Sequence, residues 1–271
     1  MLDDGVHLGD CLDLLKEIDD NSIDLVVTSP PYQVGKFYER KRSGKSFIWK
    51  AAWLGLQVFR QFARVVKPGG YVFWNFGDSG MGKRAYQTEV TTTVPMSVWY
   101  WQIGRKTRFE LQATRIWYKN FPAVSKSFVS QREPRPCFDY EHIWTFRKPG
   151  PVSQKVNVYP ASLRGVWADN DSKLFERLQI DKGHRLQAAH GADFPEYIPT
   201  LAILVYSDPG NIVLDPFGGT GTTGLSAIKT GRRYILIEKD ETFCKFAKDR
   251  LELATRQYTL PMEILSDTIE A

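Results

Sequence analysis

A glycine-rich segment between two apolar runs constrains the fold of this chain more than any other feature. Asn211–Asp215 is a short apolar run that predicts a buried strand. Residues 216–224, Pro-Phe-Gly-Gly-Thr-Gly-Thr-Thr-Gly, follow at once and lead into a helix through Leu225 and Ile228. Glycines let the backbone approach a ligand, and the start of the helix favours electron-rich groups. The pattern predicts a nucleotide-binding βαβ unit.

The acidic residue that ends the next predicted strand points to a cofactor containing ribose. Glu238 ends the run from Tyr234 and lies 23 residues after Asp215, where a carboxylate accepts hydrogen bonds from ribose hydroxyls. Because Gly219-x-Gly221-x-x-Gly224 matches the dinucleotide fingerprint, an NAD-dependent oxidoreductase is one alternative. Pro216 and Phe217 separate the strand from these glycines, whereas a dinucleotide site places its glycines at the strand end. This spacing disfavours NAD.

The rest of the chain alternates between amphipathic helices and apolar strands. Trp49 and Trp53 fall on the apolar stripe of one predicted helix, so we expect both in the core. This alternation is typical of an α/β fold with a doubly wound, mostly parallel sheet. The predicted helices cover 10–18, 49–66 and 243–254, and the further predicted strands cover 23–28, 71–76, 113–118 and 140–146.

A second rigid loop follows the strand at 23–28. The two prolines of Ser29-Pro30-Pro31-Tyr32 end the strand and fix the backbone, while the Ser29 hydroxyl and the Pro30 carbonyl offer hydrogen-bond acceptors. Tyr32 offers an aromatic face for stacking. A plain turn is the alternative for this loop taken alone. If the strands at 23–28 and 211–215 are neighbours, both loops lie at one crevice at the carboxyl ends of the strands.

The charge of the chain is compatible with a polyanionic partner. The formal net charge is +5 and the pI is about 9.0. Basic and aromatic residues mix at 36–42, which suits phosphate contacts, although a solvated loop gives the same pattern. The three cysteines are scattered, with no histidine at zinc spacing, so we expect neither a disulfide framework nor a metal site. The phosphate contacts are predicted at Lys36, Arg40, Lys41 and Arg42.

The sequence indicates neither a membrane segment nor a secretory signal. No run of about 18 apolar residues exists, and the acidic start of the chain is unlike a secretory signal. We therefore expect a cytoplasmic protein with no membrane partner.

Together these segments resemble the beta-class S-adenosylmethionine-dependent DNA amino-methyltransferases. The resemblance rests on the 215–224 loop, on Ser29–Tyr32, on Gly9-Asp10-Cys11 and on His190-Gly191-Ala192-Asp193-Phe194-Pro195, where Gly191 replaces the usual proline. Other segments, including Arg115–Lys119 and Tyr140–Ile143, are similar to further motifs of that family. The resemblance implies a circularly permuted Rossmann-like methyltransferase fold, because the catalytic loop precedes the cofactor loop in sequence.

The resemblance implies specific site residues. Catalytic roles go to Ser29, Pro30, Pro31 and Tyr32. Contacts to S-adenosylmethionine go to Asp10, Cys11, Asp215, Pro216, Phe217, Gly219, Thr220, Gly221, Thr222, Glu238, His190 and Phe194. It also implies one catalytic domain over 1–257, with target-recognition insertions at about 77–112 and 151–190 and a tail at 258–271.

The implied reaction is direct methyl transfer to an exocyclic amino group of a base flipped out of double-stranded DNA. Such a nitrogen is a poor nucleophile, because its lone pair is delocalised into the ring, so acceptors must hold the amino hydrogens. Ser29 favours N4 of cytosine, with N6 of adenine as the alternative. A DNA-binding module without catalysis is a third hypothesis, which the intact Ser29–Tyr32 loop disfavours. A homodimer and an accompanying restriction endonuclease both stay open.

Overall fold

The computed structural model describes residues 2–31, 45–81, 92–119, 129–130, 133–134, 140–151, 164–168 and 195–258. The predictions for Tyr32, Lys36, Arg40, Lys41, Arg42, His190 and Phe194 lie outside these residues, as do most of 151–190 and the tail from 259.

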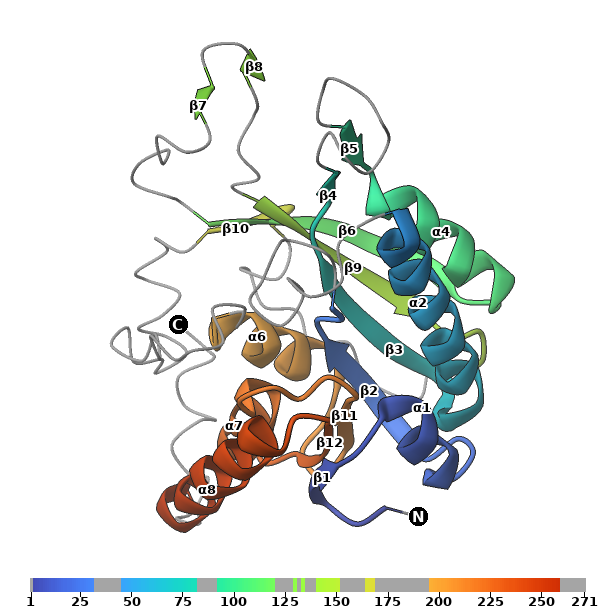
Figure 1. Cartoon of the computed structure of the whole chain (residues 1–271). Helices are drawn as coiled ribbons and strands as arrows, with labels where there is room; N and C mark the ends of the chain where they lie inside the picture. The colour runs from blue at the N-terminus through green and yellow to red at the C-terminus, as the bar shows by residue number, and fades with distance from the viewer. Residues whose placement is uncertain are drawn as a thin grey trace.

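An eight-stranded sheet forms the centre of the molecule (Figure 1). Its strand order is β1-β12-β11-β2-β3-β9-β6-β10. β9 runs antiparallel to β3 and β6, and the other pairings in this sheet are parallel. This is the mostly parallel α/β sheet predicted from the sequence. The strands are β1 (Gly5–Leu8), β2 (Ile23–Thr28), β3 (Val66–Phe76), β6 (Glu110–Tyr118), β9 (Tyr140–Arg147), β10 (Val166–Ala168), β11 (Ile212–Asp215) and β12 (Arg233–Glu238).

Helices cover both faces of the sheet, as a doubly wound fold requires (Figure 1). One face packs against α1 (Cys11–Leu14), the short helix η1 (Leu15–Glu17), α2 (Lys45–Val65) and α4 (Met96–Lys106). The other packs against α6 (Tyr197–Tyr206), α7 (Thr222–Lys229) and α8 (Glu241–Tyr258). Two small ribbons lie outside the sheet, β4 (Ser79–Met81) with β5 (Thr92–Val94) and β7 (Val129–Ser130) with β8 (Glu133–Pro134).

Most of the predicted elements are confirmed with small shifts of their ends. β2 covers the predicted 23–28, and every residue in it is buried. Asp10 caps α1 through a hydrogen bond from the Leu12 amide, as expected, although the regular α-helix ends at Leu14. Among the described residues, we find no helix with the length and apolar character needed to span a bilayer.

The prediction that Trp49 and Trp53 belong to the core is wrong. Their exposed fractions are 60% and 56%. The buried face of α2 is instead the row through Gly55, Val58 and Phe62. A Cβ at Gly55 would come within 3.0 Å of the Tyr100 ring, so the absence of a side chain lets α4 pack closely there. The inward face of α2 therefore combines Gly55, where α4 approaches closely, with large apolar side chains such as Phe59 and Phe62.

The stretch 77–112, where the resemblance implies a target-recognition insertion, contains a helix of the main fold. Within it, α4 packs against α2 and places Tyr100 and Ile103 in the same apolar cluster as β3. Asp78 lies just after β3 and accepts a hydrogen bond from the Met96 amide, which starts α4. At least residues 96–106 therefore build the core of the domain.

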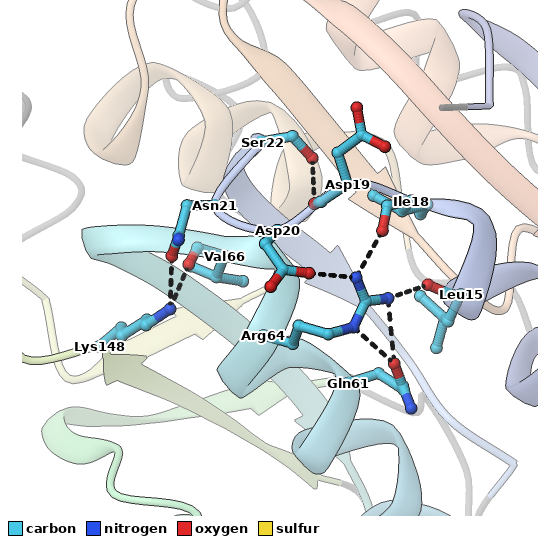
Figure 2. Close-up of polar contacts among 10 residues, drawn as sticks. All are labelled: Leu15, Ile18, Asp19, Asp20, Asn21, Ser22, Gln61, Arg64, Val66 and Lys148. Atoms are coloured by element: carbon cyan, nitrogen blue, oxygen red, sulfur yellow. Dashed lines mark hydrogen bonds and ion pairs between the residues drawn. The ribbon is translucent and has the colours of Figure 1, made fainter.

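A polar network holds the start of β2 to the end of α2 (Figure 2). The Arg64 guanidinium donates to the carbonyls of Ile18 (2.7 Å) and Leu15 (2.6 Å) and to the carboxylate of Asp20 (2.6 Å). Arg64 thereby ties α2 to η1 and to the turn before β2. Because backbone carbonyls buried without a donor are costly, this contact stabilises the packing of the first helices on the sheet.

Lys148 makes a second connection beside it (Figure 2). Its ammonium donates to the Val66 carbonyl (2.7 Å) and to the side chain of Asn21 (2.9 Å). Partial burial lowers the pKa of Lys148, while Asp20 opposes that shift. The segment after β9 is thus fastened to the start of β3.

Replacing Arg64 with Ala should lower the free energy of unfolding by about 2–3 kcal/mol, because two carbonyls and a carboxylate lose a charged donor. Urea unfolding followed by circular dichroism measures this. Arg60→Ala is the matched control, since Arg60 is an exposed arginine of α2 that contacts Gln57 at 3.3 Å, and it should change stability by less than about 0.5 kcal/mol. Equal effects of the two substitutions would contradict the assignment.

Candidate functional site

The carboxyl ends of β1, β12, β11, β2 and β3 meet at one edge of the sheet. Parallel pairing of β2 with β11 makes these strands neighbours, which is the condition on which the sequence placed their two loops together. The glycine-rich loop follows β11, and Ser29-Pro30-Pro31 follows β2. Asp10 follows β1, and Glu238 ends β12. The fold thus brings together the predicted site residues that the structure describes, although they are up to 228 positions apart (238 − 10).

The Asp215 carboxylate joins the two loops. Its Oδ1 accepts hydrogen bonds from the Thr28 hydroxyl (2.5 Å) and the Phe217 amide (3.0 Å). Its Oδ2 accepts one from the Thr223 hydroxyl (2.7 Å). Asp215 is 2% exposed, so these protein donors replace water around it. Asp215 therefore holds the end of β2 and the start of α7 in fixed positions.

Sequence reasoning assigned Asp215 to cofactor contact and gave no role to the two threonines that bind it. Burial raises the pKa of Asp215 to about 6, while the hydrogen bonds from Thr28, Thr223 and the Phe217 amide oppose the shift. The sequence offers little indication of these two contacts, because a hydroxyl at a strand end, such as that of Thr28, or in a helix turn, such as that of Thr223, usually bonds to a nearby backbone group. Only the pairing of β2 with β11 places Thr28 against Asp215.

The loop after Asp215 turns on glycines with left-handed backbone angles. Gly219 has φ +52° and Gly221 has φ +86°, conformations that residues with side chains rarely adopt. Arg250 of α8 donates to the Thr220 carbonyl at 3.1 Å. A Cβ at Gly221 would come within 3.2 Å of the Cβ of Ala247. The loop is therefore closely packed against α8 in one shape.

Two carboxylates lie beside this loop at the ends of neighbouring strands. Glu238 accepts hydrogen bonds from the amides of Gly219 (2.9 Å) and Asp240 (2.8 Å), one on each oxygen. The Gly9 amide donates to the Glu238 carbonyl (3.0 Å), which places Asp10 next to this strand end. Each Glu238 oxygen can accept a second hydrogen bond. These acceptors fit the hydroxyl and amino groups of a nucleoside cofactor.

Cys11, predicted to contact the cofactor, is a buried residue at the start of α1. Burial raises the pKa of its thiol to about 12, and Asp10 adds to the shift. The thiol therefore stays protonated at neutral pH and packs as a small apolar group.

The predicted catalytic loop is described as far as Pro31. Ser29 is half-buried and Pro30 is buried, directly after the fully buried β2. The His190–Pro195 motif is described only from Pro195, which leads into α6. There the Glu196 carboxylate pairs with Lys229 of α7 at 2.6 Å. α6 is thus tied to the helix that follows the glycine-rich loop.

No set of three His, Cys, Asp or Glu side chains in the described part of the chain is arranged to hold a metal ion. The residues gathered at the carboxyl edge are hydroxyls, carbonyls, carboxylates and loop amides. They can position a nucleoside and hold hydrogen atoms of an amino group.

Comparison with known proteins identifies the family to which the chain belongs. A family model for N6/N4 DNA methylases matches residues 23–249, which is most of the chain. The chain therefore belongs to this DNA methylase family.

Several named methyltransferases are similar to this chain in sequence. The chain is 27% identical over 250 residues to the type II methyltransferase M.BglII of Bacillus subtilis, covering 87% of this chain and 66% of the relative. It is 28% identical over 264 residues to the orphan methyltransferase M.BamHII of Bacillus amyloliquefaciens, covering 88% and 91%. It spans only 27% of the length of another relative, M.BslI from a Bacillus strain.

Solved structures share the fold. TTHA0409 of Thermus thermophilus, solved with S-adenosyl-L-methionine, has a TM-score of 0.67 and 24% identity, with 93% of this chain and 94% of that chain covered. The PvuII cytosine-N4-specific DNA methyltransferase has a TM-score of 0.65 and 22% identity, with 99% and 92% covered. These likenesses establish the α/β methyltransferase architecture.

The raised pKa of Asp215 makes a testable contribution to stability. In the folded state Asp215 releases its proton near pH 6, against an ordinary value of 3.8, so folding favours the protonated form. Its contribution to stability is present in full below pH 3.8 and is lost as the pH rises through 6.

Asp215→Asn removes this titration. We expect the unfolding free energy of the wild type minus that of the variant to fall by on the order of 2 kcal/mol between pH 4 and 6.5 and then to stay level. Urea unfolding at several pH values measures both proteins. A difference that is constant, or that rises over this range, would contradict a buried Asp215 with a raised pKa.

Proposed function

We propose that this protein transfers a methyl group from S-adenosylmethionine to the exocyclic N4 of a cytosine flipped out of double-stranded DNA. The observation that carries the proposal is the hydrogen bond between Thr28 and Asp215. It joins the residue before Ser29 to the residue that starts the glycine-rich loop. A cofactor loop and an acceptor loop held this close suit direct transfer between two bound groups.

The cofactor assignment is supported by the residues beside the loop. Gly219 and Gly221 give the loop before α7 its left-handed turns, and Glu238 and Asp10 supply carboxylate acceptors. When bound, S-adenosylmethionine supplies an electrophilic methyl group on a sulfonium. TTHA0409, with the same fold, was solved with this compound.

The protein's own part is to hold the amino group of the base. In this proposal the Pro30 carbonyl and the Ser29 hydroxyl accept the two amino hydrogens and turn the nitrogen lone pair toward the methyl group. The two consecutive prolines keep these acceptors fixed before the base arrives. A direct transfer of this kind requires no nucleophilic cysteine, which agrees with the protonated state of Cys11.

Cytosine is favoured over adenine because serine precedes the two prolines, a form typical of cytosine-N4 enzymes. The PvuII enzyme, which shares the fold, is cytosine-N4-specific. Adenine N6 is the second candidate, because the family model covers both amino groups. Lys36, Arg40, Lys41 and Arg42 are assigned to phosphate contacts, an assignment that the salt dependence of DNA binding tests. We also propose a cytoplasmic location, which localisation of a tagged chain tests.

Mass spectrometry of nucleosides tests the function. DNA is incubated with the protein and methyl-labelled S-adenosylmethionine and is then digested completely. The expected product is labelled N4-methylcytosine. Ser29→Ala should slow single-turnover transfer by about 10²-fold, because one acceptor is lost.

Ser22→Ala is the matched control, since Ser22 lies before β2, at the opposite edge of the sheet, and should keep the wild-type rate. Labelled N6-methyladenine would overturn the choice of base and keep the transfer mechanism. No transfer to any DNA, with S-adenosylmethionine still bound, would overturn the proposed function.

A further inference from the structure

Two buried acceptor atoms without donors lie at the carboxyl edge of the sheet, beside the catalytic loop. One is Oε2 of Glu141, on β9, and the other is Oδ1 of Asn75, on β3. Glu141 is 5% exposed and Asn75 is 1% exposed. Neither atom has a hydrogen-bond partner within the structure as described. Because a buried acceptor without a donor costs free energy, a ligand that supplies a donor to these atoms would be stabilised there.

Both side chains lie on the same face of the sheet. Asn75 pairs with Ile143, and Glu141 is two positions from Ile143, so alternation along the strands puts all three on one side. Ile143 belongs to the apolar cluster under α6, together with Trp117, which pairs with Glu141. β3 and β9 are neighbours in the sheet (Figure 1).

Asn75 is next to Ser29 in the fold, and Glu141 lies one strand further along the sheet. β2 and β3 are parallel, and Thr28 pairs with Trp74. Ser29 and Asn75 are the next residues along the two strands. The edge therefore carries, from β2 to β9, a hydroxyl, an amide oxygen and a carboxylate.

The other polar atoms of the two side chains already have partners. Lys119 pairs with Oε1 of Glu141 and also lies 4.9 Å from the centre of the Trp117 ring. The Asn75 amide nitrogen donates to the His142 carbonyl at 3.1 Å. One lysine and one strand carbonyl thus hold both side chains in place while Oε2 and Oδ1 stay open for a donor.

We propose that Glu141, with Asn75 beside it, is an acceptor for the amino group of the target base and discriminates amino-bearing bases from carbonyl-bearing ones. This rests on the proposed function. A cytosine or adenine offers hydrogen atoms to these oxygens, whereas thymine offers a carbonyl oxygen, which they repel. During transfer the N–CH3 bond would form as the S–CH3 bond of the sulfonium breaks, so the sulfur leaves as a neutral thioether and positive charge develops on the amino nitrogen until that nitrogen releases one proton to solvent. The Glu141 carboxylate, whose other oxygen pairs with Lys119, places a negatively charged acceptor beside that nitrogen, which the neutral Ser29 and Pro30 lack.

The experiment is a cycle between the Glu141 carboxylate and the amino group. The oligonucleotide contains the recognition sequence, located by sequencing the methylated positions of test DNA. A second oligonucleotide replaces the target cytosine with 2-pyrimidinone, which lacks the amino group. If the wild type methylates adenine instead, the second oligonucleotide contains unsubstituted purine, which lacks the amino group, in place of that adenine. The role of Glu141 can then be tested even if the cytosine assignment is wrong.

Glu141→Gln keeps the shape and removes the charge. We expect it to slow single-turnover transfer by about 10²-fold. The preference in binding for cytosine DNA over 2-pyrimidinone DNA should fall at least fivefold, while affinity for S-adenosylmethionine changes less than threefold. Transfer within threefold of the wild type would overturn the proposal.

Lys119→Gln is the matched control, because it breaks the same ion pair from the other side. It should keep the preference for cytosine DNA, whatever its effect on thermal unfolding. If both variants lose rate and keep the preference, Glu141 is a structural partner of Lys119 and the proposal is overturned.

Discussion

The arrangement of the site depends on one buried carboxylate. Asp215 is the last residue of β11. Its carboxylate accepts hydrogen bonds from Thr28 at the end of β2, from the Phe217 amide in the glycine-rich loop and from Thr223 in the first turn of α7. A carboxylate without water around it is costly to keep charged, and the raised pKa reflects this cost. Three donors offset part of the cost. The same bonds fix the distance between the glycine-rich loop and the Ser29 loop.

Contacts that stabilise the fold lie at one edge of the sheet, and the candidate site lies at the other. At the amino ends of the strands, Arg64 and Lys148 satisfy carbonyls and hold helices to strands. The Asp24 carboxylate links strands at this edge, accepting hydrogen bonds from the Ile212 amide (2.9 Å) and the Lys67 ammonium (2.5 Å). At the carboxyl ends, acceptors remain partly or wholly open, on Glu238 and Glu141. This division follows from parallel pairing, which collects the loops after the strands at one edge.

Much of the fold and of the site followed from the sequence. Glycine-rich and proline-rich loops after apolar runs identify strand ends, and parallel pairing then brings those ends together. The α2 face could not be read correctly, because Trp49 and Trp53 are large and apolar whereas Gly55 decides the approach of α4. α4 itself was missed, since its start depends on Asp78, a residue outside the helix.

The contact of Asp215 with Thr28 and the open oxygen of Glu141 were also beyond the sequence. Each depends on which strands are neighbours, and pairing of β2 with β11 or of β3 with β9 joins residues far apart in the chain. Asp10 was predictable as a cap because its partner, the Leu12 amide, is two residues away. Local hydrogen bonds can be inferred from order along the chain, and contacts across the sheet require its topology.

The central claim is that the Thr28–Asp215 bond holds the two loops in register for transfer. The most direct test compares Thr28→Val, which keeps the shape of the side chain and loses the hydroxyl, with Thr28→Ser, which keeps the hydroxyl. Single-turnover methyl transfer should fall about tenfold in the valine variant, as expected for one lost hydrogen bond to a charged group, and should stay near wild type in the serine variant. In both variants the affinity for S-adenosylmethionine should change by a smaller factor than the tenfold loss of rate in the valine variant. Equal rates in the two variants would contradict the claim.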